Sequence, residues 1–559
     1  MGPEGDLVHG KWIPVVDLDG GARDVGVLEV LAGAHEVRRL DLPAPSMLPV
    51  LLRQVLLPVV LDVLGAPRSG RDWGERFERG RLSPPEVEQV ADYLGPRYGD
   101  RLRLLDRLRP FAQVAGLDAI SGEVKPSTLL VPAIASGNNV PLFSGLTEAD
   151  DLELTLPQAA LWLLHAQCWD AAAIKTGAVG DPQAKAGKTT GNPTGALGQL
   201  GVIVPTGRTL YETLLLNIPV LPDGLDPADR PQWAASDGPL PAGVADPGSP
   251  RWSARPPLGL LDLLTFQSRR IRLIPVETDD GVRVRQVVIC AGDRMTATSQ
   301  TEPHTAWTHT AKPKAGRPAY RPRRHLSGRA AWQGMAALLA LTLPEDSDGP
   351  YTSVLLRQIG DLNAEGWLPP DYPLGVTTCA LEYGNQSAVV EHALADSIPL
   401  PVATLVAARD TVRAAVLECV AQADLVARAL NYLHGDLRRA VGGDALPRDK
   451  GEHPSERLLH TVDRGMRRLL AGLRTVGDDA DLLDKGQAAW EAVLRQAAVR
   501  EAEGLLAAAP ARATVGRTVK VNGKDVVYRA GAARARFYRT LDETLWRAAE
   551  ASRAGEVTV

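Results

Sequence analysis

The sequence predicts an α+β protein with a large mixed N-terminal domain, residues 1–400, and a C-terminal four-helix bundle, residues 401–559. Before residue 400, short segments of alternating apolar and polar residues flank turn formers, which is the pattern of small sheets and hairpins. After Pro401, apolar residues instead recur with the 3.6-residue period of helices. A chain of 559 residues is also too long for one ordinary hydrophobic core, so two or more domains are expected.

Three segments of the N-terminal domain predict strands joined by a tight turn. The first is an alternating strand that ends in an Asp-Gly turn, and the other two have strand patterns on both sides of a turn. The segments are Asp6–Gly20, Ser268–Cys290 with its turn at Asp279-Asp280-Gly281, and Val376–Pro401 with its turn at Gly384-Asn385-Gln386.

Helices are predicted between these hairpins. Met47–Leu64 is apolar nearly all round, which indicates a buried helix, and Pro58 is expected to kink it. Ser83–Leu94 opens with a serine cap and two prolines suited to a first helical turn. The remaining helical patterns are Tyr98–Leu108, Pro157–Trp169 and Arg208–Pro219.

Four long helical segments follow Pro401, and a small hairpin with its turn at Asn522-Gly523 lies before the last of them. Short connections between amphipathic helices are typical of a bundle whose apolar stripes face one another. The segments are Val402–Val441, Pro454–Val476, Asp481–Ala509 and Ala532–Ala551.

Composition narrows the class of protein. The chain is 45% hydrophobic and 23% charged, with a formal net charge of −5, so any nucleic-acid binding must come from local basic patches. Its four cysteines lack C-x-x-C spacing, which predicts free buried thiols and neither a zinc ribbon nor a disulfide framework. We expect a cytoplasmic protein with no membrane contact, because the N-terminus has no signal-peptide pattern and no apolar run approaches 18 residues uninterrupted by charge. We also expect no cofactor and no metal, because the sequence offers no H-x-x-x-H metal-site motif.

The stretch Ala171–Gly201 is rich in glycine and lysine, which predicts a loop that contacts an anion. Gly187-Lys188-Thr189 resembles the end of a nucleotide-binding P-loop, but the required first glycine is replaced by Pro182. A nucleotide, a nucleic-acid backbone and a solvated loop without ligand therefore stay open as interpretations. The lysines available for phosphate contacts are Lys175, Lys185 and Lys188.

Two further segments are candidates for contacts. Residues 312–329 carry seven cations and no acid, among them Arg321, Arg323 and Arg324, which favours either a solvated face or a contact with nucleic acid or another subunit. Val131–Leu146 is a turn-rich loop in which Phe143 either packs under its own loop or projects toward a partner.

Several motifs occur together in one order along the chain: Lys11-Trp12-Ile13-Pro14-Val15, Ser136-Gly137-Asn138-Asn139 with Pro141-Leu142-Phe143, the loop from Lys175, Thr209–Pro219, Phe266–Leu273 and Arg534–Trp546. Their shared order resembles the large subunit of type I-E Cascade, the CasA family. That family is the non-catalytic part of an RNA-guided CRISPR surveillance complex that reads the protospacer-adjacent motif (PAM) in double-stranded DNA. The resemblance therefore implies PAM recognition through the minor groove, help with opening the duplex into an R-loop, and recruitment of a helicase-nuclease.

The resemblance also implies roles for particular residues. Gly177-Ala178-Val179-Gly180 is similar to the family's groove-reading glycine loop, and Asn385-Gln386 is similar to its wedge at a hairpin tip. A minor groove is narrow, and glycine holds no Cβ between the backbone and the bases, which suits this role. Lysines and arginines nearby would hold DNA phosphates, which position the duplex without specifying its sequence.

The implied partners are the other Cascade subunits, the CRISPR RNA (crRNA) and target DNA. Asn138, Asn139 and Phe143 resemble the loop that anchors the subunit to the crRNA 5′ handle. The sequence departs from the family near Cys290, where zinc-ribbon cysteines of some members are missing. The family's minor-groove lysine has no clear equivalent, because Arg294 lies near the expected place and Thr296 or Thr298 aligns about as well. Two alternatives to this function stay open. One is a P-loop enzyme that uses Lys188 and Thr189, and the other is an inert scaffold subunit.

Overall fold

The computed structural model describes residues 2, 5–134, 145–147, 150, 152–296, 302–343, 346–447, 451–477, 479–521 and 523–556. The chain divides into two compact units. Unit 1 contains residues 1–327, 340–368 and 374–397, and unit 2 contains residues 328–339, 369–373 and 398–559. Two short segments that precede residue 398 in the sequence thus belong to the second unit.

A small antiparallel sheet begins unit 1. Its strands β1 (Ile13–Asp17), β2 (Ala22–Val25) and β3 (Val37–Leu40) lie in the order β2-β1-β3, with α1 (Val27–Ala32) between the last two in sequence. Trp12 is buried and donates its indole N–H to the carbonyl of Leu7 at 2.9 Å. The hairpin predicted for this region is confirmed.

The predicted buried helix Met47–Leu64 is present and carries a π-helical turn. It consists of α2 (Met47–Leu51), the π turn η1 (Leu52–Leu56) and α3 (Leu57–Leu64). Proline lacks an N–H and crowds the preceding turn, and the π turn just before Pro58 accommodates that break. The helix is long and apolar enough to cross a membrane, yet 78% of it is buried inside the protein, as in a core helix.

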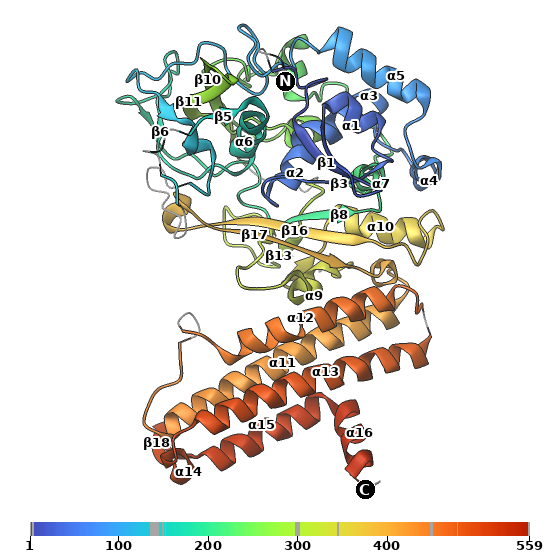
Figure 1. Ribbon diagram of the computed structural model, residues 1–559, viewed down its shortest axis with the longest axis vertical. Coiled ribbons are helices and arrows are strands. Elements are labelled where there is room, and N and C mark those ends of the chain that lie inside the picture. Colours follow the sequence, from blue (N-terminus) through green and yellow to red (C-terminus); the bar gives the residue numbers. More distant parts are fainter. Residues whose placement is uncertain are drawn as a thin grey trace. The chain divides into compact units, whose positions relative to one another are not determined.

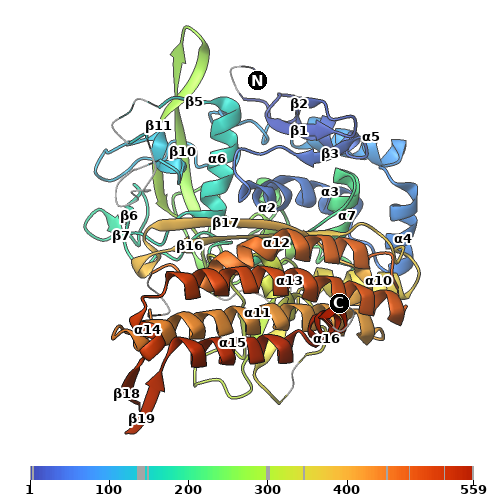
Figure 2. The same cartoon turned by 60° about the horizontal axis from the view of Figure 1, so that its bottom comes forward.

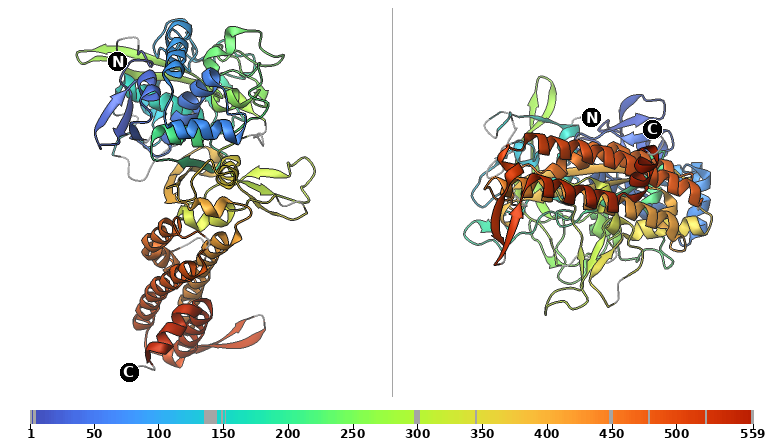
Figure 3. Two further views of the ribbon diagram at one scale, coloured as in Figure 1. Left: turned by 90° about the vertical axis from the view of Figure 1, so that its right-hand side faces the viewer. Right: turned by 90° about the horizontal axis from the view of Figure 1, so that it is seen from below.

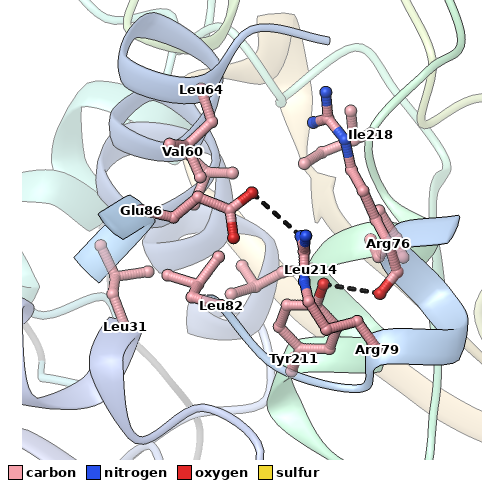
Figure 4. Close-up of a pocket in the computed structure, with 11 residues that line it drawn as sticks. Leu31, Val60, Leu64, Arg76, Arg79, Leu82, Glu86, Tyr211, Leu214 and Ile218 are labelled. Carbon is pink, nitrogen blue, oxygen red and sulfur yellow. Dashed lines mark hydrogen bonds and ion pairs between the residues drawn. The ribbon is translucent and has the colours of Figure 1, made fainter. Parts of the chain in front are cut away.

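The next helices surround a small hollow in unit 1 (Figure 4). They are α4 (Gly70–Arg79), α5 (Pro84–Asp92) and α7 (Leu210–Leu216), together with α1 and α3. Ser83 and Glu86 form the capping box expected at the start of α5. The prediction of a helix over Tyr98–Leu108 is wrong: a π turn containing Pro96, η2 (Tyr93–Arg97), ends the helical run, and turns follow.

The largest sheet of unit 1 is built on the hairpin of β10 (Arg269–Thr278) and β11 (Gly281–Ala291), as the sequence predicts. Short strands join it: β4 (Lys125–Pro126), β5 (Leu154–Thr155), β6 (Lys175–Thr176) and β7 (Lys188–Thr189). Helix α6 (Leu156–Trp169) packs against β10 and β11 (Figure 1). Its Gln167 bonds the backbone N–H of Arg269 at 2.9 Å, which fixes where the following loop begins.

A second long hairpin in unit 1 pairs β16 (Gly375–Tyr383) with β17 (Val390–Pro399), and β8 (Val202–Thr206) lies on the other side of β16. Its tip is the turn η6 (Asn385–Ser387). Shorter elements complete the unit: η3 (Ser127–Leu130), η4 (Gln232–Asp237), β9 (Ala254–Arg255), α8 (Leu260–Leu264), β12 (Arg294–Met295), β13 (Trp307–His309), β14 (Tyr320–Pro322), β15 (Gly349–Tyr351) and α10 (Val354–Ala364).

Unit 2 is dominated by long helices that run side by side (Figure 2). Helix α11 (Asp410–Ala440) packs on α12 (Pro454–Leu473), α13 (Ala480–Ala508) and α15 (Ala530–Thr544), and α12 also packs on α13. The predicted helical segments are present with two differences. The first long helix begins at Asp410 and not at Val402, and the segment Ala532–Ala551 forms two helices that are separated at Leu545. The smaller elements are η5 (Ala331–Gly334), α9 (Met335–Leu338), η7 (Val402–Leu405), α14 (Arg512–Val515), β18 (Arg517–Val521), β19 (Lys524–Tyr528) and α16 (Trp546–Glu556).

Buried polar groups tie α16 to the helices of unit 2. The fully buried carboxylate of Glu491 accepts hydrogen bonds from Arg547 and Gln422, both at 2.9 Å, and from the backbone N–H of Ala548 at 3.1 Å. A buried carboxylate needs such partners because its desolvation is costly. The hairpin β18–β19 projects away from the helices of this unit (Figure 3). All four cysteines of the chain are free and buried, as predicted.

Candidate nucleic-acid interface

The glycine and lysine stretch Ala171–Gly201 starts from an anchored residue, Asp170, at the end of α6. The Asp170 carboxylate pairs with Lys175 at 2.5 Å and with the buried guanidinium of Arg269. Burial alone would raise the pKa of Asp170, but the charges of Lys175 and Arg269 outweigh it and hold the pKa at about 2. The charge of Lys175 is thus already matched inside unit 1, which sets it apart from the two lysines further along the stretch.

Gly177 has no room for a side chain. A Cβ there would lie 2.8 Å from Cβ of Ala184 and 3.0 Å from the carbonyl carbon of Gly187. Both backbone groups of Gly177 are hydrogen-bonded. Its N–H donates to the carbonyl of Gly187 at 2.8 Å, and its carbonyl accepts from the N–H of Ile120 at 2.9 Å. The glycine at this position therefore holds the two arms of the loop together.

Val179 and Gly180 form the exposed tip of the loop. Ala178 is buried at 1% exposure, whereas Val179 is 57% exposed and Gly180 is also exposed. Gly180 has a φ of +83°, and a Cβ there would meet only Pro250, at 3.4 Å. Among the described residues, neither its N–H nor its carbonyl has a hydrogen-bond partner. The tip therefore presents unpaired backbone groups with no side chain in front of them.

Arg294 is held beside this tip by Trp252. Its guanidinium carbon lies 4.0 Å from the centroid of the indole ring, and its Nη2 donates to the carbonyl of Thr190 at 2.7 Å and to Asn192 at 3.0 Å. The indole N–H of Trp252 donates to the carboxylate of Asp181 at 3.1 Å, one residue after Gly180. A cation stacked on an aromatic face keeps a fixed direction. Partial burial and the charge of Arg269 lower the pKa of Arg294.

Lys185 and Lys188 flank a tight turn at the exposed end of the stretch. Ala186 and Gly187 have φ values of +49° and +72°, and the backbones of the two lysines are hydrogen-bonded to each other at 2.8 and 3.0 Å. Lys188-Thr189 then forms β7, which pairs with β6. A P-loop instead needs this lysine at the N-terminus of a helix, so the nucleotide-binding alternative does not fit the backbone.

The predicted wedge lies at the tip of the β16–β17 hairpin. Asn385 and Gln386 are both exposed, and Gln386 and Ser387 have φ values of +53° and +56°. Two consecutive residues with positive φ form a tight hairpin turn, which is closed by the hydrogen bond from the N–H of Ala388 to the carbonyl of Asn385 at 3.1 Å. The left-handed backbone conformation costs about 1–2 kcal/mol for each residue that is not glycine. Strain of this kind is typical of functional sites.

The hairpin tip is attached to the glycine and lysine stretch. The carbonyl of Ser387 accepts a hydrogen bond from Ala172 N–H at 2.8 Å, and Tyr383 donates its hydroxyl to the carbonyl of Trp169 at 2.6 Å. Figures 1 and 2 show the tip on the same side of unit 1 as β6. The stretch that carries the predicted glycine loop is thus bonded at its start to the turn of the predicted wedge, although the two are far apart in the sequence.

Part of the basic run packs against the other end of the stretch. Arg324 donates to the carbonyl of Gly198 and to Gln199, and a Cβ at Gly201 would lie 2.3 Å from the carbonyl oxygen of Arg323. Arg321 and Arg323 have exposed side chains. The structure therefore places residues 321–324 against the C-terminal end of the stretch, at Gly198–Gly201.

Trp252 and Asp181 were not singled out from the sequence. Trp252 lies in an irregular segment, and no local pattern marks an aromatic residue as the partner of a distant arginine. The predictions for Asn138, Asn139, Phe143 and Thr298 concern residues that lie outside the described ranges. In the described part of the chain, no group of three or more His, Cys, Asp or Glu residues is arranged to hold a metal ion.

Sequence and structure comparisons define the class to which this arrangement belongs. The fold is that of Cse1 proteins: it matches Cse1 of Thermobifida fusca with a TM-score of 0.81 at 29% identity, covering 98% of this chain and 99% of that one. Cse1 of Acidimicrobium ferrooxidans gives a TM-score of 0.77 at 26% identity, covering 97% and 98%.

The sequence model of the family described as CRISPR-associated protein Cse1 matches residues 6–500. The chain belongs to the Cse1 family. It is 32% identical over 280 residues to CRISPR-associated protein CasA/Cse1 of Thermus thermophilus. That alignment spans 50% of each sequence, so the chain matches about half the length of this curated relative.

Proposed function

We propose that this chain is the non-catalytic large subunit of an RNA-guided CRISPR surveillance complex of the Cascade type, recognises the PAM in double-stranded DNA, helps to open the duplex into an R-loop and supports recruitment of a helicase-nuclease. One observation carries the proposal: an exposed glycine tip, a stacked arginine and a strained hairpin tip are joined through one stretch of chain. Family membership supports the assignment to the complex.

PAM reading in this proposal uses the minor groove. The groove is about 6 Å wide and displays mainly hydrogen-bond acceptors, with the amino group of guanine as its single donor. The backbone N–H and carbonyl of Gly180 can meet both kinds of group, and Arg294 supplies a cation with several donors. Because the code of the groove is degenerate, this site accepts several related PAM sequences.

Duplex opening in this proposal uses Gln386 as a wedge, supported by Asn385. Inserting a side chain between base pairs costs a few kcal/mol per unstacked step. The hydrogen bonds of the hairpin and of Ala172 already hold the turn in its strained conformation. The free energy needed to order the wedge is therefore supplied by folding, before DNA binds. Exchange of the DNA duplex for the guide heteroduplex is nearly balanced, and a small contribution at the first step decides whether it starts.

Phosphate contacts in this proposal come from exposed cations around the stretch. Lys185, Lys188, Arg321 and Arg323 are exposed, whereas Lys175 and Arg324 already have partners within unit 1. Counterion release by such residues strengthens binding and makes it salt-dependent. We therefore assign Lys175 to holding the loop and the exposed cations to holding the duplex.

The proposed partners are the other Cascade subunits, the crRNA, target DNA and the helicase-nuclease, in the cytoplasm. A chain of a solved structure described as a CRISPR RNA-guided surveillance complex has the same fold, with a TM-score of 0.66 at 19% identity. Residues Asn138, Asn139 and Phe143 are proposed as the anchor to the crRNA handle and its capping subunit.

The competing proposal is an inert scaffold whose loop does not touch DNA. The test measures binding of duplexes with and without a PAM by the assembled complex carrying Gly180→Asp. Our proposal predicts loss of PAM preference, because a carboxylate at the tip repels the DNA. An unchanged preference would establish the scaffold alternative. Gly180 is the better site for this test than Gly177, where any side chain disturbs the loop itself.

A further inference from the structure

A cavity of about 130 Å³ lies in unit 1 beside the proposed wedge. Its walls come from four places: the segment around Leu130, the end of α6, the start of the glycine and lysine stretch, and Ala388 and Val390 of the β16–β17 hairpin. By contrast, the hollow among α1, α3, α4, α5 and α7 measures about 20 Å³ (Figure 4). A hollow of that size holds about one water, so of these two hollows of unit 1 the one beside the wedge has room for a ligand.

The size of the cavity fits a single aromatic ring. A cavity of roughly 150 Å³ in another protein accepts benzene, which is a six-membered ring. The volume of about 130 Å³ beside the wedge therefore suits a ring of this size and is small for a fused two-ring system. Among nucleobases, that selects the pyrimidines.

The walls offer an apolar platform and a matched pair of polar groups. Trp169 lines the cavity, and aromatic or apolar walls are what enzymes place around an unstacked base. Asp170 and Lys175 lie at one side, 2.5 Å apart. Both ion pairs of Asp170 use Oδ2, so among the described residues its Oδ1 has no partner and can accept a hydrogen bond. The Lys175 ammonium keeps further N–H groups to donate.

This acceptor and donor, side by side, complement the pairing edge of a pyrimidine. Cytosine offers its amino group to a carboxylate and a ring nitrogen to an ammonium, and thymine or uracil offers a ring N–H and a carbonyl oxygen. His165 also lines the cavity, and burial lowers its pKa to about 3, so at neutral pH it adds no charge. The cavity thus recognises a base without placing a second cation against it.

The position of the cavity, next to the proposed wedge, indicates which molecule occupies it. Ala388 is two residues after Gln386 in the same turn, and the stretch that carries Asp170 and Lys175 is hydrogen-bonded to that turn through Ala172 and Ser387. A wedge that unstacks a base pair leaves a base without its neighbours, and an unstacked base in water is unfavourable. A pocket for that base next to the wedge offsets part of the cost of opening.

We propose that this cavity captures one unstacked pyrimidine base next to the wedge. The inference rests on the proposed function and adds a base-binding pocket to it. The same pyrimidine chemistry is present in the target DNA and in the crRNA, so the experiment labels each strand separately.

The experiment is photocrosslinking in the fully assembled complex. In one arm the target duplex carries 4-thiothymidine at single positions next to the PAM, and in the other arm the crRNA handle carries 4-thiouridine. Sulfur replaces only one carbonyl oxygen, so the ring keeps its size. After irradiation at long wavelength, crosslinked peptides are identified by mass spectrometry. We expect a crosslink in residues 165–175 or 388–390 from at least one arm, and the arm that gives it identifies the source of the base.

Filling the cavity is the matched perturbation. Ala173→Leu adds bulk to its wall, and Ala172→Leu makes the same change at a neighbouring residue that does not line it. We expect the crosslink to fall about tenfold in the first variant, because a ring no longer fits, and to persist in the second. Ala388→Leu fills the cavity from the β16–β17 hairpin and replaces Ala173→Leu in the experiment if the Ala173→Leu complex does not assemble.

Two outcomes overturn the inference. One is the absence of a cavity crosslink from both arms in a wild-type complex that opens PAM-bearing duplexes normally. The other is a crosslink that both cavity-filling variants retain. The proposed function fails differently, through a wild-type complex that binds duplexes with and without a PAM equally well.

Discussion

The sharpest prediction concerns Gly180, whose replacement by alanine separates DNA reading from folding. The substitution adds one methyl group at the exposed tip of the loop. The new Cβ would meet only Pro250, at 3.4 Å, which is an ordinary contact distance. The backbone at φ +83° is unfavourable for alanine and costs about 1–2 kcal/mol. The fold of unit 1 therefore survives the change.

The effect on DNA binding follows from the position of the methyl group. It stands in front of the unpaired N–H and carbonyl that we assign to the minor groove. A hydrogen bond of this kind contributes on the order of 1 kcal/mol or more, and 1.4 kcal/mol corresponds to a tenfold change in affinity. We therefore expect the affinity of the assembled complex for a PAM-bearing duplex to fall about tenfold, with little change for a duplex that lacks a PAM.

The assay is equilibrium binding of labelled duplexes at one fixed salt concentration, because phosphate contacts make affinities salt-dependent. Gly177→Ala is the contrasting variant, since its Cβ would lie 2.8 Å from Ala184 and disturb the loop. It should lower the melting temperature of the isolated chain more than Gly180→Ala does. An unchanged PAM affinity in a well-folded Gly180→Ala complex would refute the assignment of the tip to the minor groove.

Three further predictions follow from the same site. Gln386→Ala should slow R-loop formation more than it weakens initial duplex binding, and equal R-loop rates in stopped-flow measurements would remove the wedge. Trp252→Leu should weaken PAM binding about threefold to tenfold, because a cation–π contact of roughly 0.5–2 kcal/mol orients Arg294, while Trp252→Phe should restore most of it. Burial lowers the pKa of His165 to about 3, below its usual 6.5, so protonation of His165 favours the unfolded chain. The free energy of unfolding should therefore fall by up to about 1.4 kcal/mol for each pH unit below pH 6.5. His165→Gln should reduce that pH dependence in denaturant titrations.

Local signals made much of the fold predictable. The hairpins at Asp279-Asp280-Gly281 and at Gly384-Asn385-Gln386 are marked by turn residues between alternating segments, and both lie where the sequence places them. Ser83 with Glu86 likewise marks the start of α5. These features depend on residues a few positions apart, which is the range over which sequence patterns carry information.

Long-range pairings were not predictable in the same way. Nothing near Lys175 indicates that Asp170 and Arg269 hold it, since the partner strand β10 comes much later in the chain. The stacking of Arg294 on Trp252 is similar, because the sequence does not distinguish Trp252 from the other aromatic residues as the partner. The mistaken helix over Tyr98–Leu108 has a local cause, since Pro96 sits in the π turn that ends the helix before it.

The most direct test of the central claim compares PAM preference with and without this chain. Complexes of the remaining subunits and crRNA are assembled alone and together with the chain, and binding to duplexes that differ only in the PAM is measured. We predict that the preference for the PAM appears only when the chain is present and that Gly180→Ala diminishes it. A preference of the same size without the chain would contradict the account.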